Sequence, residues 1–487
     1  MSYGFPRSPG AGFPILSNDE LEAIHNGSLI VLEKTGVKIP SEKCLKILHG
    51  MGCEIDDKEQ VARIPAHVIR ESLKRRKSIV RLGARNPKYN IDLDGRHAAV
   101  HSFGTAIFTL DLETGKRRGS VSDDIVKNAK IASALDSLHV FWPCVTSLDV
   151  PPHIRDLTDI KTALCSCEKH LCQGGGDASA AHARYVIRMA AAICGGTDEL
   201  RRNPIISSNH CPISPLGFKG GSVEAALEYA GAGIPTNICT CPISGATGPV
   251  TLAGSLVLAN AEMLGGFALI QSAFPGAPFI YGDNVVPMDM RTCRRAVGSM
   301  ENVLMEVVIG QLGRRYGLPA MVDMYSTANT PGAECMLEKS FFYLAYANAD
   351  MIGGTGGIED GKTFSFEQQV IDGELADMYN RLMRGIEVND TTLAIDLIDK
   401  VKKGTGEFLT QRHTRDYLRT ENFIPSLLKR QMYDEWTKGG SKSIVDLARE
   451  KAKKIISEYS IKPLEKDVQQ NIDTVLKQAD KEFSQLT

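Results

Sequence analysis

From about Val100 to Gly385 the sequence repeats one local pattern eight times. In each repeat a short apolar or β-branched run ends in Gly, Pro, Asn or Ser, and a longer stretch with helical spacing of apolar residues follows. Strands that alternate with helices form parallel βαβ units, and eight units favour a closed (β/α)₈ barrel. An open doubly wound sheet is the alternative, but its G-x-G-x-x-G turn is missing after the first strand. The predicted strands read VHSFG, VFWPC, HLCQGG, PIISSNH, PTNICTC, FIYGDN, AMVDMY and DMIGG.

The rest of the chain is too long to be linkers alone, because a barrel of this kind takes ~250 residues and the chain has 487. Residues 1–98 mix helix and short strands, and we expect an N-terminal α+β subdomain there. Residues 99–385 form the predicted barrel. Residues 386–487 are helical and charged, and we expect a C-terminal helical extension that packs on the barrel or on another subunit.

The composition excludes several classes of protein. Lys and Arg number 56 against 58 Asp and Glu, a formal net charge of −2, so nothing favours nucleic acid or an acidic membrane as partner. Twelve cysteines in 487 residues form no dense disulfide framework, and the N-terminus lacks a secretory signal pattern. The most apolar stretch, 251–274, is interrupted by Asn260, Glu262 and Gln271, which favours a buried helix over a membrane span. We therefore expect a cytoplasmic protein with reduced thiols.

The active site of such a barrel lies at the C-terminal ends of its strands. Three loops there are rich in glycine, namely GGG from Gly174, SGATGPV from Ser244 and GGTGG from Gly353. Small residues let a bulky group approach the backbone, although the same glycines also fit simple tight turns. An aromatic side chain at a strand end can equally be core packing. The strand ends carry His101, Phe103, Trp142, Gln173, Asn209, His210, Ser244, Tyr281, Asp283, Tyr325 and Asn329.

Cysteines near the strand ends raise the question of a metal. Cys239 and Cys241 lie two apart on one strand and so face the same side. Three more, Cys144, Cys172 and Cys211, lie near other strand ends, and together these thiols could assemble a zinc site. No C-x-x-C or H-E-x-x-H spacing supports one, and buried free cysteine is common. The sequence therefore favours structural thiols and no bound metal.

Six long motifs in the barrel and C-terminal segments carry a resemblance to a known family. Through these motifs, which occur in the order of the family, the chain resembles the trimethylamine methyltransferase superfamily over most of its length. The resemblance implies a TIM barrel that moves a methyl group from an amine to the cob(I)alamin of a separate corrinoid protein, with no cofactor bound tightly by this chain. The motifs are NPIISSNHCPISPLGF from Asn203, ISGATGPVTLAGSLVLANAEMLGG from Ile243, PGAPFIYGDNVVPMDMRT from Pro275, RRYGLP from Arg314, FSFEQQVIDGELADM from Phe364 and FLTQRHTRDYLRTENFIPSLLKR from Phe408.

One departure from the family narrows the expected substrate. Founding members carry pyrrolysine in the loop after the seventh strand, whereas here that loop reads YSTANTPGAECMLEK, with Asn329 close to the equivalent region. Members without pyrrolysine that resemble this chain are associated with quaternary amines such as glycine betaine, proline betaine or carnitine. A quaternary ammonium already carries its charge and leaves as a neutral amine, so it needs no further activation. We therefore expect a betaine-type methyl donor.

If the methyl donor is a betaine, side-chain chemistry predicts a role for each candidate residue. Aromatic faces bind a quaternary ammonium by cation–π attraction, and the predicted cage consists of Phe103, Trp142, Tyr281 and Tyr325. The carboxylate of a betaine needs hydrogen-bond donors, and Asn209, His210 and Arg291 are the candidates. Two residues are predicted at the catalytic centre, Asn329 and Glu367, the latter either a carboxylate near the cation or a helix N-terminal acid. The glycines expected to receive the corrinoid partner are Gly175, Gly245, Gly354 and Gly356.

Two other functions remain open from the sequence. One is a zinc-dependent corrinoid methyltransferase for a different methyl donor, which would use the strand-end cysteines. The other is a barrel that binds a betaine or a corrinoid protein without catalysis. For the leading function and for both alternatives, we expect a homo-oligomer that contacts neither nucleic acid nor a membrane.

Overall fold

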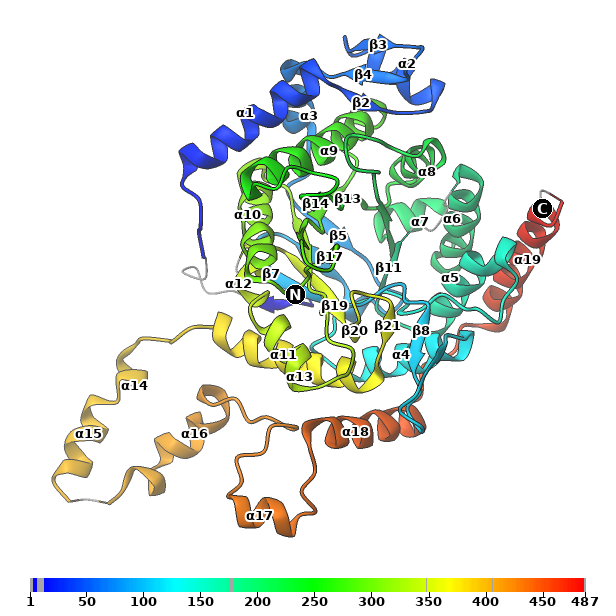
Figure 1. The fold of residues 1–487 in the computed structure, drawn as a ribbon. Coiled ribbons are helices and arrows are strands. Elements are labelled where there is room, and N and C mark those ends of the chain that lie inside the picture. The colour runs from blue at the N-terminus through cyan, green and yellow to red at the C-terminus, as the bar shows by residue number, and fades with distance from the viewer. Residues whose placement is uncertain (1–2, 7–12, 175–178, 347, 405, 486–487) are drawn as a thin grey trace.

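Eight parallel strands close into a barrel, which confirms the predicted fold. The structure, a computed structural model, describes residues 3–6, 13–174, 179–346, 348–404 and 406–485. The strands follow one another in chain order, and β19 pairs with β7 to close the ring (Figure 1). Each of the eight predicted runs overlaps one barrel strand. The barrel strands are β7 (His97–Ser102), β10 (Val140–Phe141), β11 (His170–Gly174), β12 (Ile206–His210), β13 (Thr236–Thr240), β15 (Phe279–Asp283), β18 (Ala320–Asp323) and β19 (Met351–Thr355).

A ring of helices covers the outside of the barrel (Figure 1). The longest, α9 (Leu252–Ala273), is apolar on every side because it packs on the strands within and on α1 and α3 without. Among the described residues it is the one helix long and apolar enough to cross a membrane, and 83% of its apolar window is buried, as expected for a core helix. The others are α4 (Ser122–Ala134), α5 (Arg155–Ser166), α6 (Ala180–Cys194), α7 (Thr197–Arg202), α8 (Gly220–Gly231), α10 (Met300–Tyr316), α11 (Ala333–Ser340), α12 (Tyr343–Tyr346) and α13 (Phe366–Met383).

The N-terminal segment covers one side of the barrel and closes its bottom. Helices α1 (Asn18–Lys34) and α3 (Ala66–Arg75) lie on α9. The hairpin of β5 (Val80–Leu82) and β6 (Ile91–Leu93) packs its buried residues against inward-facing residues of the barrel strands, including Ala99, Cys172 and Met321. In the described part of the chain, the hairpin therefore covers this end of the barrel and leaves the opposite end for a ligand. The remaining elements are β1 (Phe5–Pro6), β2 (Val37–Lys38), α2 (Glu42–His49), β3 (Glu54–Asp56) and β4 (Val61–Arg63).

Small sheets built from the loops frame the open, C-terminal end of the barrel. The loops after the first and eighth strands pair in the order β20-β21-β8-β9, and the loops after the fifth and sixth pair in the order β14-β16-β17. Paired loops hold their side chains more rigidly than free ones, which suits a binding site. Their bounds are β8 (Phe108–Leu110), β9 (Arg117–Gly119), β14 (Ile243–Ser244), β16 (Val286–Asp289), β17 (Arg294–Arg295), β20 (Gly357–Ile358) and β21 (Thr363–Phe364).

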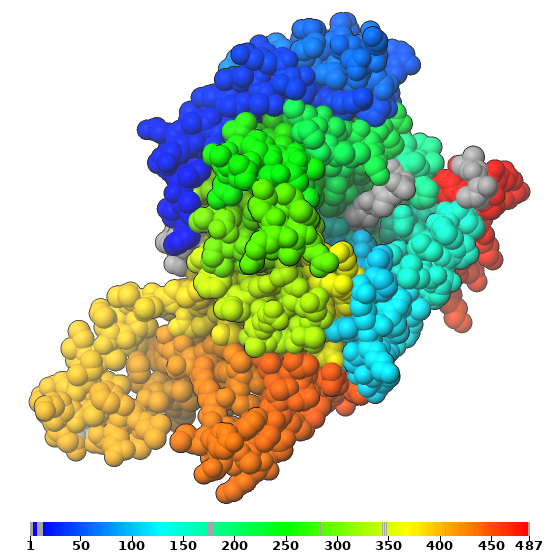
Figure 2. Space-filling view, viewed as in Figure 1, coloured from blue at the N-terminus to red at the C-terminus, as the bar shows by residue number. Residues whose placement is uncertain are grey.

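The C-terminal helices fall into two groups. Helix α18 (Ile444–Glu458) packs on α13 and α4, and α19 (Lys466–Phe483) packs on α6. Between α13 and α18 the chain runs out from the barrel in a segment that we call the arm (residues 386–433) (Figures 1 and 2). Its helices contain no buried residue, although Leu427, which follows them, is buried and donates its amide to Glu374 of α13. The arm contains α14 (Asp390–Leu393), α15 (Ile395–Lys402) and α16 (Arg412–Glu421), and α17 (Tyr433–Lys438) begins at its end.

Candidate active site

The strand ends line the open mouth of the barrel with polar and aromatic side chains. Residues alternate between the inside and the outside of each strand, so the position two after the inward Ala99 and Val140 also faces in. That rule brings His101 and Trp142 together, with ring centroids 5.7 Å apart. Asp323, two residues after inward Met321, faces the same space. The mouth therefore changes from an apolar floor to a polar upper layer.

His101 and Asp323 form the deepest polar pair of this layer. His101 Nε2 lies 3.3 Å from Asp323 Oδ1, and the two side chains are 1% and 3% exposed. Tyr325 Oη donates to the other oxygen, Asp323 Oδ2, at 3.1 Å. Gly353 permits the arrangement, because a Cβ there would lie 1.5 Å from the His101 ring. A carboxylate is thus held inside the mouth beneath aromatic rings.

Three of the four predicted cage residues lie at this mouth. Phe103 and Tyr325 meet edge to face with ring centroids 5.3 Å apart. Trp142 is 5% exposed, and its Nε1 has no hydrogen-bond partner among the described residues. It borders a cavity of about 250 Å³ that Asp159 and Gln173 also line. Burial raises the pKa of Asp159 to about 6.

Tyr281 and His210 do not lie at the mouth, and the roles predicted for them are corrected here. Tyr281 points out of the barrel, where its hydroxyl donates to Asn260 Oδ1 at 2.8 Å. His210 also points outward, with Nδ1 3.3 Å from Ser222 Oγ on α8, and burial lowers its pKa to about 4. Each of these residues directly follows an inward-facing residue of its strand and therefore faces outward. The sequence shows where the strands lie but does not show which alternate residues face inward.

Three cysteine thiols meet on the inner wall of the mouth. The sulfurs of Cys211, Cys239 and Cys241 all lie within 4.8 Å of one another. Cys239 and Cys241 face inward from β13 and its end, and Cys211 directly follows β12, the neighbouring strand. Cys241 Sγ donates to Cys239 O at 3.8 Å, and the close contact of the three thiols lowers the pKa of Cys211 and raises that of Cys239. All twelve cysteines of the chain are free.

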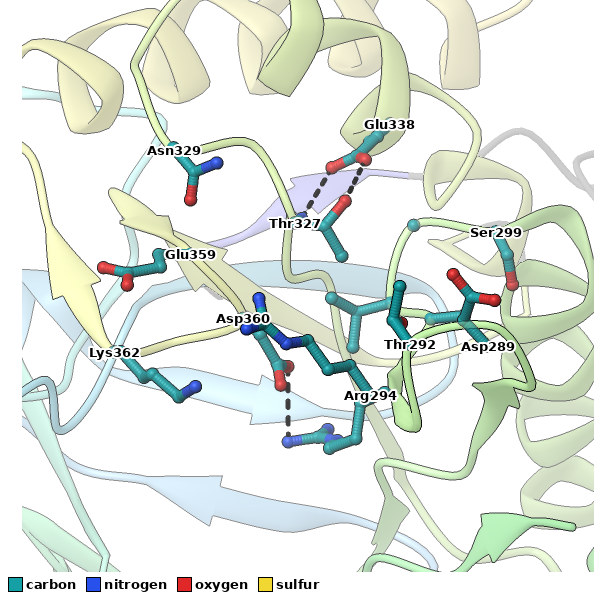
Figure 3. A pocket seen from close by; sticks show the side chains of 14 residues that line it. Asp289, Thr292, Arg294, Ser299, Thr327, Asn329, Glu338, Glu359, Asp360 and Lys362 are labelled. Carbon is teal, nitrogen blue, oxygen red and sulfur yellow. Dashed lines mark hydrogen bonds and ion pairs between the residues drawn. The ribbon is translucent and has the colours of Figure 1, made fainter.

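A second, polar cavity of about 530 Å³ lies above this layer, between the loops that follow the last three strands (Figure 3). Arg295 connects it with the layer below, since its guanidinium lies 6.0 Å from the Tyr325 ring centroid and donates to Asn284 Oδ1 at 2.9 Å. Asp360 pairs with Arg295 at 3.5 Å, and burial raises the pKa of that carboxyl. Asn329, one of the predicted catalytic residues, lines this outer cavity and is exposed.

Two other predicted residues have different surroundings from those expected. Glu367 is 1% exposed at the start of α13, where it accepts a hydrogen bond from Arg449 Nε of α18 at 3.0 Å. It anchors a C-terminal helix from the first turn of α13, and its predicted catalytic role stays a prediction. The Arg291 side chain is 90% exposed and pairs with Asp289 at a loop tip. Arg295, four residues later, is the arginine that reaches the mouth.

The glycines predicted to receive a partner are shaped by their own packing. Gly354 and Gly356 have φ of +97° and +87°, and a Cβ on them would lie 2.0 Å from Met324 O and 2.4 Å from the Phe364 ring. Gly245 has φ of +90° in the loop before α9. Gly175 and the side chain of Asp283 lie outside the described residues. Conformation and close approach therefore already require glycine at three of the four positions.

Asn209 lies at the mouth as predicted. The sequence analysis assigned no role to Asp323 or Arg295, and it did not predict that His101 pairs with Asp323. Asn209 is 6% exposed, and its Oδ1 has no hydrogen-bond partner in the described part of the chain. The signal for Asp323 was present, because a charged residue inside the apolar run AMVDMY is costly unless it is paired. No comparable signal distinguished Arg295 among its neighbours.

Comparison with known proteins places this mouth in context. A family model described as trimethylamine methyltransferase (MTTB) matches residues 2–484. The trimethylamine methyltransferase MttB of Desulfitobacterium hafniense is 33% identical over 486 residues, which cover 99% of this chain and 97% of that protein. A glycine betaine methyltransferase of the same species is 28% identical, covering 97% and 98%. Among solved structures, the monomethylamine methyltransferase of Methanosarcina barkeri shares the fold, with a TM-score of 0.50 at 12% identity, over 95% of this chain and 92% of that one.

Proposed function

The chain belongs to the trimethylamine methyltransferase family, and we propose that it moves a methyl group from a quaternary amine to the cob(I)alamin of a separate corrinoid protein. Glycine betaine, proline betaine and carnitine are the candidate donors. The similarity to a glycine betaine methyltransferase supports this choice. So does the sequence itself, which consists of standard residues in the loop where pyrrolysine stands in founding members.

One observation carries the proposal, namely aromatic rings around a buried carboxylate at the mouth. Tyr325 donates to Asp323 and packs edge to face on Phe103, while Trp142 lies beside His101, the other partner of Asp323. A trimethylammonium group is apolar on its surface and positive overall, so rings and a nearby carboxylate suit it better than hydrogen-bond donors do. Each good desolvated cation–π contact contributes ~2 kcal/mol.

For this reaction the protein mainly has to position the methyl donor. The corrinoid of the partner supplies the nucleophile that accepts the methyl group, while the electron pair of the broken carbon–nitrogen bond remains on the neutral amine. No general acid is needed for that leaving group. The barrel must therefore hold the cation in line with the entrance and exclude water, and orientation of this kind can lower the barrier by ~7–11 kcal/mol. The closed floor and the buried ring layer suit this task.

The carboxylate of a betaine has two candidate partners at the mouth. Arg295 retains donors beyond those that meet Asn284 and Asp360. Asn209 faces the barrel interior from β12 with a side-chain amide that can donate. Charge-assisted hydrogen bonds from the guanidinium would fix the orientation of the substrate as well as its affinity.

The outer cavity suits the approach of a corrinoid protein. Its walls are polar and mixed in charge, with three basic residues (Arg294, Arg295 and Lys362) and four acidic ones (Asp289, Glu338, Glu359 and Asp360). A corrin ring is too large to enter the layer of rings below. The partner would then cap the mouth beside the loops of Gly245 and of Gly354 and Gly356. A transient interface of that sort would bury ~1,200–2,000 Å² in total.

The arm supports the proposal of a homo-oligomer. Its helices contain no buried residue, and several apolar side chains in it are strongly exposed, among them Ile386, Ile395, Leu409 and Met432 at 84%, 67%, 80% and 75%. It contains seven acidic and eight basic side chains, so it has no single sign of charge that selects an oppositely charged partner. A second copy of the chain, which offers the same mixed surface, is its proposed partner.

A panel of methyl donors tests the function. The protein is mixed with cob(I)alamin and either a quaternary amine or trimethylamine, and the loss of cob(I)alamin absorbance is followed together with the mass of the demethylated amine. We expect turnover of at least one quaternary amine and none of trimethylamine. Robust turnover of trimethylamine contradicts the proposed substrate class. Binding of a betaine with no methyl transfer to free or protein-bound cob(I)alamin favours the non-catalytic alternative.

A further inference from the structure

The three thiols at the mouth are the one group of at least three His, Cys, Asp or Glu side chains, among the residues the structure describes, whose ligand atoms converge closely enough for a metal ion. Their sulfurs all lie within 4.8 Å of one another. In a tetrahedral site with Zn–S of ~2.3 Å, sulfurs stand ~3.8 Å apart. Closing the cluster onto an ion thus requires only side-chain adjustments of about an ångström.

The strands fix this convergence. Cys239 and Cys241 alternate onto the inner face of β13 and its end, and β12 pairs in parallel with β13 through His210 and Ile238. Cys211 follows His210, which places it beside Cys239 in the next step of the register. One ligand therefore lies within a strand, and the other two follow directly after the ends of paired strands.

The chemistry of the cluster selects the ion. Thiolates are soft ligands that favour zinc over magnesium or calcium. Three thiolates around a divalent ion leave one net negative charge, and Arg295, which reaches the same mouth beside the Tyr325 ring, supplies a positive charge there. Cys239 is buried, whereas Cys211 is exposed toward the mouth. A site with three protein ligands and one accessible side is the arrangement of zinc sites that keep an open position.

We propose that Cys211, Cys239 and Cys241 bind one zinc ion as thiolates, with the fourth position open to the barrel mouth for water or for an anionic donor such as a carboxylate. The protons released by the thiols pass to solvent on binding. This site differs from the structural thiols that the sequence favours. It does not rest on the proposed methyl donor, because metal binding is measured without any substrate.

Metal content and cobalt spectroscopy test the proposal. The full chain is purified under reducing conditions with zinc in the medium, dialysed, and analysed for zinc per chain. Apo protein is then titrated with Co²⁺, which reports thiolate ligation through a near-ultraviolet charge-transfer band and tetrahedral coordination through visible d–d bands. Two ligand variants are compared, Cys239→Ser and Cys211→Ser, and the exposed position of the second keeps the test valid if the first misfolds.

Each ligand variant has a matched control. Cys172→Ser changes a thiol that is as buried as Cys239, at 3% exposure, and that faces inward from β11, but lies outside the cluster. Cys293→Ser changes an exposed loop thiol, as Cys211→Ser does.

We expect one zinc per chain and a thiolate-to-cobalt band in the parent and in both controls, and loss of both signals in the two ligand variants. A folded parent protein without stoichiometric zinc and without the charge-transfer band overturns the proposal. The same holds if the controls lose the metal as completely as the ligand variants do, since binding would then not depend on this cluster.

Discussion

At the residue scale, the direction of an aromatic side chain determines its role. A ring on the inner face of a barrel strand can bind a cation at the mouth, whereas a ring on the outer face packs against the helices. Trp142→Leu keeps an apolar side chain at the mouth but removes the ring, so we expect the affinity for a quaternary amine to fall by ~1–2 kcal/mol, about tenfold. Isothermal titration with the donor identified by the panel measures it. Tyr281→Phe is the control on the outer face, where losing the hydrogen bond to Asn260 should cost ~1 kcal/mol of stability and leave affinity unchanged. Unchanged affinity in folded Trp142→Leu would assign that ring to packing.

Two arginines four residues apart provide a matched pair for the carboxylate. Arg295 lies at the mouth, whereas the Arg291 side chain is 90% exposed on a loop tip. We expect Arg295→Met to weaken glycine betaine binding by ~1.5–3 kcal/mol, the contribution of a hydrogen bond to a charged group. Choline, a quaternary amine without a carboxylate, should bind both proteins alike. Equal losses for betaine and choline would mean that Arg295 only supports the structure, and Arg291→Met should change neither affinity.

A site residue could be predicted from sequence only where the sequence also indicated which face of the strand its side chain occupies. Trp142, Phe103 and Tyr325 lie at the mouth because each keeps the parity of an inward neighbour. Tyr281 and His210 lie one residue out of that parity, and a shift of one residue moves a side chain to the opposite face. Arg295 was missed for another reason, because its place depends on the pairing of β16 with β17 inside a loop. Short loop pairings have no periodic signal in the sequence.

At the scale of elements, a buried ion pair holds the glycine loop of the eighth strand in place. Lys339 of α11 and Asp372 of α13 are both 0% exposed and lie 2.7 Å apart. Asp372 also accepts the Gly356 amide at 2.8 Å, and Lys339 donates to Gly354 O at 2.9 Å. Lys339→Met leaves the carboxylate buried and uncompensated, so we expect a loss of ~3–5 kcal/mol in the free energy of unfolding, measured by urea denaturation.

The double variant Lys339→Met with Asp372→Leu is the control for this pair. Replacing both partners by apolar residues is often close to neutral, so we expect it to recover most of the stability lost by the single variant. Lys403→Met, in an exposed pair with Asp399, should leave the unfolding midpoint unchanged. A single Lys339→Met variant as stable as the parent would show that the pair does not hold the loop.

Barrel elements were predictable because each repeat contains its own signal. An apolar run buried on both faces, a glycine or polar stop and an amphipathic helix recur in every unit, so all eight strands were located. The same local pattern does not reveal how segments far apart in the sequence meet. The floor hairpin β5–β6 and the mouth sheet β20-β21-β8-β9 were therefore not foreseen. For the same reason, the helical C-terminus was expected as one extension, although α18 and α19 pack on the barrel whereas helices α14, α15 and α16 contain no buried residue.

At the scale of the whole molecule, the arm is the part that a single chain does not account for. It extends from the barrel as a separate lobe (Figure 2) and exposes Ile395, Ile398 and Leu409 at 67%, 53% and 80%. Exposed apolar surface of this extent on helices without a core indicates an interface.

We expect the purified protein to be a homo-oligomer, and the triple variant Ile395→Glu, Ile398→Glu and Leu409→Glu to shift it to monomer in light scattering after size exclusion. Because these residues contact no buried core, circular dichroism and amine affinity should stay as in the parent. A parent protein that is monomeric at micromolar concentration, or a triple variant that remains an oligomer, would contradict this role of the arm. Retained methyl transfer to free cob(I)alamin by the monomer would further show that the mouth of each barrel is complete within one chain.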